Sequence, residues 1–207
     1  MTLHVSGHPL LREKLTRLRD ERTQPRDFRA LVAEIATLLL YEATADLPLA
    51  DHDVRTPLAP YRGARLAEQV GLVPVLRAGI GMIEAALALM PEAQVWHIGL
   101  FRDERTLRPI EYYNKLPAGA TAQVCLVLDP MLATGGSAVA TIDILERWGA
   151  RRVKYVGIIA APEGVAALSA AHPSVPIHIA ALDERLNEKG YIVPGLGDAG
   201  DRQFGTG

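Results

Sequence analysis

The sequence contains one cysteine, Cys125, among 207 residues. A single cysteine excludes an intrachain disulfide and a zinc site built from a cysteine cluster. Because Cys125 lies in the apolar run VCLVLD, we expect a buried small hydrophobic residue there and not a nucleophile. We expect His97 and His178, which lie within predicted strands, to be structural residues.

Long apolar runs and blocks of like charge are also missing. No apolar run reaches membrane-spanning length, and residues 1–14, MTLHVSGHPLLREK, show no basic stretch followed by an apolar core. These absences predict a cytoplasmic protein without a membrane partner. The net charge is −2 with dispersed charges, which argues against a surface dedicated to nucleic acid.

What the sequence does contain is an alternation of strand and helix from residue 72 onward. At 207 residues and 49% hydrophobic, the chain is expected to form one α/β domain over residues 1–207. The alternation predicts right-handed βαβ units on a parallel sheet, with ligands beyond the carboxyl ends of the strands. RAGIG and DPMLATGGS lie at that edge. The predicted strands are 72–76, 95–101, 123–129, 153–161 and 175–182, and the predicted helices are 82–90, 137–149 and the segment after Ala161.

The two ends of the chain have a different character. Apolar spacing predicts helices over residues 9–22 and after Pro25. Residues 46–66 contain three prolines and no helical period, which predicts an extended arm or edge hairpin and favours a homo-oligomer, a dimer or tetramer. The glycine-rich tail from residue 187 is expected to be neither helix nor ordinary strand, yet structured, since its apolar residues are rare in disordered tails.

Residues 129–137 place an acid and a glycine-rich turn before a helix. Backbone N–H groups of such a turn, with the hydroxyls of Thr134 and Ser137, can form an anion site strengthened by the helix dipole. A simple helix cap by Ser137 or Thr134 is an equally open reading of the turn alone. A Walker loop is excluded because no lysine follows the second glycine, and a Rossmann fingerprint is missing.

Four segments, taken in order, resemble the uracil branch of the type I phosphoribosyltransferases: VPVLRAGIGM, GLFRDERTLRPIEYYNKLP, VLDPMLATGGSA and YIVPGLGDAGDRQFGT. The resemblance covers nearly the whole chain, and GDAGD is its most diagnostic part. It implies an α/β parallel-sheet fold with helices on both faces, an extended N-terminal arm and a C-terminal hood over the base. It also implies the reaction of uracil with phosphoribosyl diphosphate (PRPP) to give UMP and diphosphate. Pro130 departs from the wider superfamily, which has a second acid there, so a single carboxylate serves this turn.

The resemblance further implies which residues act. Asp129 would accept hydrogen bonds from the ribose and stabilise the developing cation, Arg77 would face the diphosphate, and Asp198 would reach PRPP directly or through Mg²⁺. These three are the catalytic candidates. The implied PRPP-binding residues are Arg77, Arg102, Asp129, Pro130, Met131, Leu132, Ala133, Thr134, Gly135, Gly136, Ser137 and Asp198, and the implied uracil-binding residues are Ile192, Gly197, Asp198 and Ala199.

Mg²⁺ is the cofactor that the resemblance implies, carried mainly by PRPP and water and not by a protein metal site. Some family members respond to GTP, so GTP stays open as an effector. Arg105, Arg108 and Lys115 lie in a stretch that could close over the site, although a solvated face is the favoured reading. Two other functions stay open: an RNA-binding pyrimidine regulator, which needs a concentrated basic face, and a purine transferase, which the YIVPGLGDAGD tail opposes.

Overall fold

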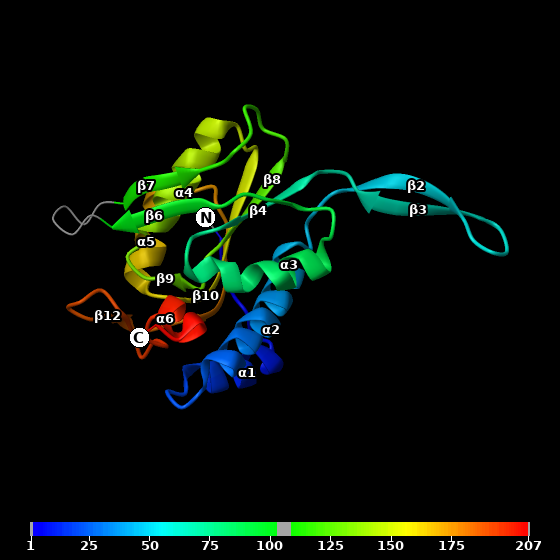
Figure 1. The fold of residues 1–207 in the computed structure, drawn as a ribbon. Coiled ribbons are helices and arrows are strands. Elements are labelled where there is room, and N and C mark those ends of the chain that lie inside the picture. The colour runs from blue at the N-terminus through cyan, green and yellow to red at the C-terminus, as the bar shows by residue number, and fades with distance from the viewer. Residues whose placement is uncertain (1, 103–108, 207) are drawn as a thin grey trace.

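A computed structural model describes residues 2–102 and 109–206, without the side chains of residues 100–102 and 109–110. Its centre is a parallel sheet in the order β1-β11-β10-β8-β4-β5, with β9 pairing beyond β8 on the same side of β10 (Figure 1). This confirms the predicted parallel α/β sheet. The strands of the sheet are β1 (Leu3–Val5), β4 (Val70–Pro74), β5 (Gln94–Val95), β8 (Val124–Leu128), β9 (Met131–Leu132), β10 (Arg152–Ala160) and β11 (Ile177–Leu182).

Helices cover both faces of the sheet, as predicted (Figure 1). Successive residues of β8 alternate between two apolar cores: Leu126 packs in the first, whereas Cys125 and Val127 pack in the second. Because both faces are covered, β8 is apolar at every position. The first core holds α1 (Pro9–Arg19), α2 (Pro25–Ala43) and α3 (Ile83–Leu89), and the second holds α4 (Gly136–Trp148) and α5 (Pro162–Ala171).

Cys125 is fully buried, as its position in an apolar run predicts. Burial raises the pKa of its thiol to about 12, so the thiolate is not formed at neutral pH. A thiol in this state packs as a small apolar group.

Both N-terminal helices begin with proline in their first turn, where a missing N–H does no harm. The α1 helix ends at Arg19, three residues before the predicted end, because the chain turns at Asp20. The α2 helix buries one face, with Phe28, Ile35 and Leu39 among its fully enclosed side chains. Burying each of these contributes about 1.5–3 kcal/mol to folding. No helix among the described residues is long and apolar enough to cross a bilayer.

The proline-rich segment forms the predicted hairpin, which projects away from the sheet and its helices (Figure 1). It consists of the antiparallel strands β2 (Leu49–Arg55) and β3 (Pro60–Leu66). Their side chains are exposed apart from Ala50 and Gly63, which are partly buried. The hairpin therefore gains little from contact with the body of the same chain.

The predicted strand over residues 95–101 is interrupted at Trp96 and His97, and of the described part that follows only Ile98 still bridges the central sheet, at Val75. After β5, the strand β6 (Ile98–Arg102) pairs antiparallel with β7 (Pro109–Asn114), which the sequence pattern did not predict. Trp96 turns its ring back over the sheet, where a Cβ on Gly71 would lie 2.2 Å from it, and packs edge-on against Trp148 at 4.7 Å. The ring is therefore packed at the break between β5 and β6.

The C-terminal tail is structured, as predicted, but it contains a helix where none was expected. Short strands β12 (Arg185–Leu186) and β13 (Ile192–Val193) pair, and α6 (Ala199–Phe204) follows. Asp198 caps α6 by accepting a hydrogen bond from the Asp201 N–H at 2.9 Å, and Gly205, with φ of +65°, ends it. The helix is short, and its cap compensates for the glycine content of the segment.

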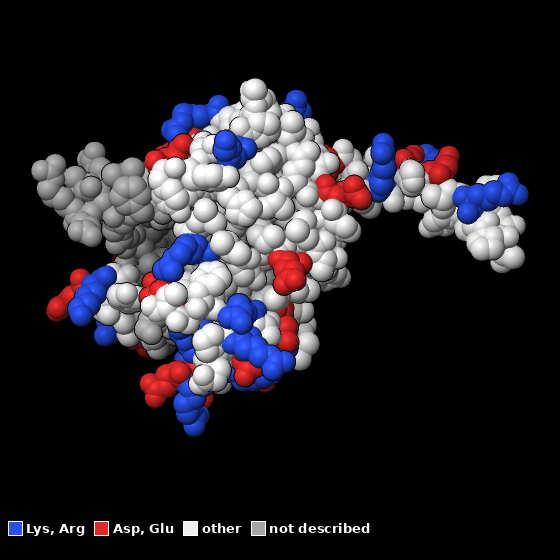
Figure 2. Space-filling model, in the orientation of Figure 1, with Lys and Arg blue, Asp and Glu red and all other residues white. Residues whose placement is uncertain are grey.

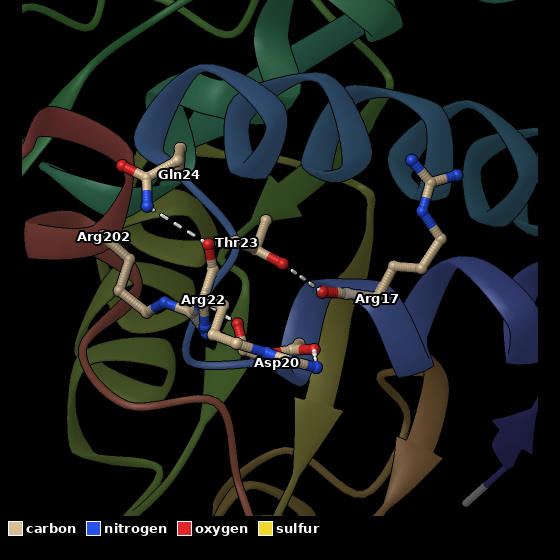
Figure 3. A network of polar contacts seen from close by, with 6 residues as sticks. All are labelled: Arg17, Asp20, Arg22, Thr23, Gln24 and Arg202. Carbon is tan, nitrogen blue, oxygen red and sulfur yellow. Dashed lines mark hydrogen bonds and ion pairs between the residues drawn. The ribbon is translucent and has the colours of Figure 1, made fainter.

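The tail is fastened to the loop between α1 and α2 (Figure 3). Arg202 donates to the carbonyls of Leu18, Asp20 and Leu196 at 2.6–2.9 Å and lies 4.4 Å above the Phe28 ring. The loop itself is closed by the Thr23 hydroxyl, which donates to the Arg17 carbonyl at 2.6 Å, and by an Asp20–Arg22 pair (Figure 3). The tail and the N-terminal helices thus form one packed unit.

Candidate active site

The turn between β8 and α4 lies at the carboxyl edge of the sheet, where the sequence predicts an anion site. Gly135, with φ of +82°, is the N-cap residue of α4, and it has no side chain with which to cap the helix. Ser137 lies inside α4 and is therefore not its N-cap residue. The first N–H groups of a helix lack intrahelical acceptors and favour anions. A small pocket of about 80 Å³ lies here, lined by Asp129 and residues 131–138.

Two glycines, one in the turn and one in α5, allow the turn to pack closely against α5. A Cβ on Gly164 of α5 would lie 2.4 Å from the Ala133 carbonyl oxygen and 2.5 Å from that of Leu132. A Cβ on Gly135 would lie 3.0 Å from both Ala167 and the Gly164 carbonyl. The turn therefore rests directly on the backbone of α5, which fixes its shape.

Asp129 immediately follows β8 and is half-buried beside the pocket. Its carboxylate accepts a hydrogen bond from the Met131 N–H at 3.3 Å, and its carbonyl accepts one from the Tyr155 hydroxyl at 3.0 Å. Burial raises the pKa of the Asp129 carboxyl to about 7; the Met131 N–H opposes this shift, and the nearby Asp198 charge adds to it. The charge effect places Asp198 close to Asp129, although the two residues belong to different segments.

Arg77 follows β4 at the same edge, after a cis peptide bond with Leu76. It precedes the short 3-10 helix η1 (Ala78–Met82), whose Gly79 packs so closely that a Cβ would lie 2.3 Å from the Leu128 carbonyl oxygen. The Arg77 side chain is 57% exposed, and its Nη2 donates to Asp201 Oδ1 at 3.1 Å. Its guanidinium can therefore face a ligand.

Asp198 meets Arg77 at the start of α6. A Cβ on Gly200 would lie 3.2 Å from Asp198 Oδ1 and 3.7 Å from Arg77 Nη2, which places both groups around this glycine. The structure therefore brings together the three catalytic candidates from three separate segments.

The predicted uracil residues lie in the same tail. Ile192 is buried in β13, Gly197 has φ of +79°, and Ala199 is the fully buried first residue of α6. They surround Asp198 in the sequence and present main-chain groups on a segment held in place by packing.

Two anchors of this tail were missed by sequence reasoning. Arg19 donates to both oxygens of Asp183 at 2.5 and 2.7 Å and to the Gly195 carbonyl at 2.6 Å. Gln203, fully buried, donates to the carbonyls of Ala78 and Ala199, each at 3.0 Å, and so ties α6 to η1. Arg19 lies 164 residues from Asp183 and 176 from Gly195, and Gln203 lies 125 residues from Ala78, so no local pattern indicates these contacts.

The remaining predicted residues include some that the structure does not describe. Arg102 ends β6, but its side chain lies outside the described residues, as do Arg105 and Arg108; Lys115 is exposed. His178 stacks on His4 with 4.4 Å between ring centroids, across the pair β1 and β11, as a structural residue would. No cluster of three His, Cys, Asp or Glu side chains suited to a metal occurs in the described part of the chain.

A larger cavity of about 540 Å³ lies at the base of the β2–β3 hairpin, between residues 65–70 and 89–93. It contains none of the predicted site residues. Size alone would select this cavity, but the anion-binding geometry and the perturbed carboxyl both select the edge of the sheet.

Known proteins of one family match nearly the whole chain. The family model of uracil phosphoribosyltransferase matches residues 5–206. The uracil phosphoribosyltransferase of Roseiflexus castenholzii is 63% identical over 203 residues, covering 98% of each chain. That of Geobacillus kaustophilus is 55% identical over 205 residues, covering 99% of this chain and 98% of the relative.

Solved structures show the same fold. A protein from Aquifex aeolicus superposes with a TM-score of 0.93 at 38% identity, over 99% of both chains. The purine phosphoribosyltransferase of Pyrococcus horikoshii, at 14% identity and a TM-score of 0.50 over 74% of this chain and 84% of that one, shares the fold alone. On its sequence, its fold and the order of its motifs, the chain belongs to the uracil phosphoribosyltransferase family.

Proposed function

We propose that the site at the carboxyl edge of the sheet carries out the reaction of this family, transferring the phosphoribosyl group of PRPP to uracil and releasing UMP and diphosphate. One observation supports the proposal above all. The small pocket of the turn contains Asp129, and Asp198, which lies beside Arg77, is close enough for its charge to act on Asp129. In the reaction the anomeric carbon loses diphosphate and develops oxocarbenium character, as in glycoside cleavage. The protein must hold a phosphate, stabilise a cation and receive the diphosphate.

The turn at 130–137 would hold the ribose 5′-phosphate through main-chain N–H groups and the hydroxyls of Thr134 and Ser137. Asp129, beside this turn, would accept hydrogen bonds from the ribose hydroxyls. In its ionised form it would stabilise the positive charge that develops at the anomeric carbon. Binding a cationic centre favours the ionised carboxyl, which opposes the effect of burial.

Arg77 and Arg102 would bind the departing diphosphate, because the guanidinium fork matches phosphate oxygens. Arg77 is exposed at the ligand edge and has room to make this contact. Asp198 would act at the PRPP end of the site, on the same side as Asp129.

Uracil would be read by main-chain groups of Ile192, Gly197 and Ala199, beside Asp198. Along O2, N3–H and O4 uracil presents acceptor, donor and acceptor, whereas cytosine reverses the pattern at N3 and C4. The hydrogen bonds that hold the tail keep these readers from reorienting. Two buried mismatches imply discrimination of roughly 10²–10⁴-fold against cytosine.

Mg²⁺ is the proposed cofactor, carried mainly by oxygens of PRPP and water. The donor set fits this ion, because Asp129 and Asp198 lie close enough for the charge of one to raise the pKa of the other. Two neighbouring carboxylates offer the hard oxygen ligands that Mg²⁺ prefers. When bound, the metal would neutralise part of the charge on the diphosphate leaving group.

A homo-oligomer, a dimer or tetramer, is also part of the proposal. An isolated two-stranded hairpin is marginal in water, and β2–β3 exposes Leu49, Val54 and Tyr61. Contact with another copy would cover these side chains. Whether GTP acts as an effector is tested by the rate with and without GTP, and a cytoplasmic location stays a prediction.

The alternative of an RNA-binding regulator needs a concentrated basic face. On the face shown in Figure 2, Lys and Arg are interspersed with Asp and Glu over the helices and the hairpin. This distribution favours the enzyme on that face.

The decisive experiment measures kcat/KM for uracil, cytosine, adenine and hypoxanthine with saturating PRPP and Mg²⁺. We expect uracil to be used and cytosine to be at least 100-fold poorer, following the two mismatches above. A purine as the better substrate, or cytosine within tenfold of uracil, would contradict the proposed base site. Tight, salt-resistant RNA binding without transferase activity would favour the regulator instead.

A further inference from the structure

The environment of Arg77 contains one residue to which no role has been given, Asp201. Arg77 carries a long, exposed side chain at the start of η1. Left to itself, such a side chain samples many rotamers, and ordering it opposes the binding of a ligand. Asp201 Oδ1 accepts a hydrogen bond from Arg77 Nη2 at 3.1 Å, which restricts the guanidinium to the region above the start of α6.

Asp201 is itself held in place from two directions. Its Oδ1 also accepts a hydrogen bond from the Thr206 hydroxyl at 2.7 Å, and its carbonyl accepts from the N–H groups of Gly205 and Thr206. Its own N–H donates to Asp198 Oδ1 at 2.9 Å. The bonds from Thr206 and Arg77 lower the pKa of the Asp201 carboxyl, so it stays ionised at neutral pH. A fixed anion of this kind can define where a flexible cation lies.

We propose that Asp201 is a positioning residue that holds the Arg77 guanidinium where the diphosphate of PRPP is to be bound; this inference rests on the proposed role of Arg77. Asp201 touches no substrate atom and acts through Arg77. Because Asp201 and Ala199 belong to the same short helix, the docking of the base-reading tail and the placement of Arg77 become a single event. Gln203 reinforces this link by tying α6 to η1.

The same contact between Asp201 and Arg77 could instead inhibit the binding of PRPP. If Asp201 competed with the diphosphate for Arg77, its removal would improve the binding of PRPP. A positioning role predicts weaker binding, because Arg77 then has to be ordered by the ligand alone. The direction of the change in KM therefore separates the two roles.

The experiment compares Asp201→Ala and Asp201→Asn with the wild-type enzyme. Ordering one long side chain corresponds to about a 2–10-fold change in a binding constant, so Asp201→Ala should raise the KM for PRPP and the Kd for magnesium diphosphate by that factor. The kcat at saturating PRPP should change less than KM does. Asp201→Asn keeps an oxygen acceptor for both Arg77 and Thr206 and should recover much of the loss.

Three further variants separate positioning from a general effect on the tail. In the Arg77→Ala background, Asp201→Ala should have no additional effect on KM, since the residue through which it acts is gone. Glu184→Ala removes another exposed tail carboxylate, paired with Arg185 at 3.2 Å, and should leave KM unchanged. Thr206→Val should weaken PRPP binding in the same direction as Asp201→Ala, by a smaller factor.

Binding of magnesium diphosphate, measured by calorimetry, keeps this inference separate from the proposed reaction. A wild-type protein without activity on uracil would overturn the proposed function, and diphosphate binding would still test Asp201. The positioning role is overturned by an unchanged or lower KM and Kd in Asp201→Ala, or by an effect that persists in the Arg77→Ala background. If Asp201→Ala proves unfolded by thermal melting, Thr206→Val decides the question: a raised KM for PRPP that is absent in the Arg77→Ala background supports the positioning role, and an unchanged or lower KM overturns it.

Discussion

At the scale of single residues, chemical role in this site follows from surroundings more than from residue type. Asp129 and Asp201 are both carboxylates at the same edge of the sheet. Burial raises the pKa of Asp129 to about 7, whereas hydrogen bonds from Thr206 and Arg77 lower that of Asp201. One of them therefore titrates near neutral pH, and the other remains an anion throughout the range in which the protein is expected to work.

Replacing Arg77 with alanine is expected to damage the reaction and to spare the fold. The pair with Asp201 is exposed to solvent, so its loss should change stability little. Loss of the diphosphate contact should remove about 2–4 kcal/mol of transition-state stabilisation. The measurement is kcat/KM for PRPP together with a thermal melt. Near-normal kcat/KM in a folded Arg77→Ala protein would contradict the assignment.

The activity of the free enzyme should rise with pH through about 7, because Asp129 has to lose its proton to act on ribose. Asp129→Asn should lower kcat more than it raises KM and should remove this pH dependence. The measurement is kcat/KM for PRPP from about pH 5.5 to about pH 8.5, because the pH dependence of this ratio reports the pKa values of the free enzyme. An unchanged profile in the Asn variant would assign the titration to another group.

Ionisation of Asp129 lowers the stability of the fold, whereas it is expected to raise activity. The folded protein keeps the Asp129 proton up to about pH 7, whereas the unfolded chain releases it near the ordinary aspartate pKa of 3.8. The folded state thus binds more protons in this window, and stability falls as the pH rises through it, by at most about 4 kcal/mol. Asp129→Asn should gain stability over the wild type at pH 8 and not at pH 4, in denaturant titrations near these values.

At the scale of elements, the phosphate turn depends on α5 beneath it. Gly164→Ala would place a methyl carbon 2.4 Å from the Ala133 carbonyl oxygen, so the turn or the helix has to move. Although alanine favours helix over glycine by about 1 kcal/mol, we expect a net loss of about 1–3 kcal/mol in stability and a higher KM for PRPP.

A matched control is available in the same chain. Gly7 has no atom within 4 Å of its Cβ position, so Gly7→Ala should change neither stability nor KM. Equal behaviour of the two variants would mean that the turn does not rest on α5 in the way the geometry indicates.

At the scale of the whole molecule, His178 of β11, which stacks on His4 of the edge strand β1, makes the stability of the fold sensitive to acid. The pKa of His178 is lowered to about 4, mainly by burial and also by the neighbouring His4 and Lys154 charges, while Asp46 opposes them. Between pH 6.5 and about 4 the unfolded chain binds the extra proton, so stability falls as the pH falls through this window.

His178→Phe should remove this loss while keeping a ring to stack on His4. The variant should exceed the wild type in unfolding free energy near pH 4.5 by up to about 3 kcal/mol, and the two should approach each other near pH 7. Parallel stability curves over that range would assign the acid sensitivity to other groups.

The sequence by itself determined most of the periodic elements and the position of the candidate site. Buried strands read as apolar runs and helices as spaced apolar residues, because burial on a sheet or helix follows the local repeat of the backbone. The parallel order then placed Arg77 and the turn after Asp129 at the same edge. The prolines of residues 46–66 likewise indicated a hairpin outside the sheet.

The tertiary structure alone decided the break at Trp96, the short helix α6 and the partners of the charged residues. Arg77 meets Asp201 across 124 positions, and Arg19 meets Asp183 across 164. Such contacts depend on which surfaces come together once the apolar faces are buried, so a local sequence pattern does not predict them. The same applies to α6, whose start is fixed by the Asp198 cap and whose place is fixed by Gln203 on η1. Local repeats encode burial, whereas the partners that set the chemistry of this site are chosen by packing over long range.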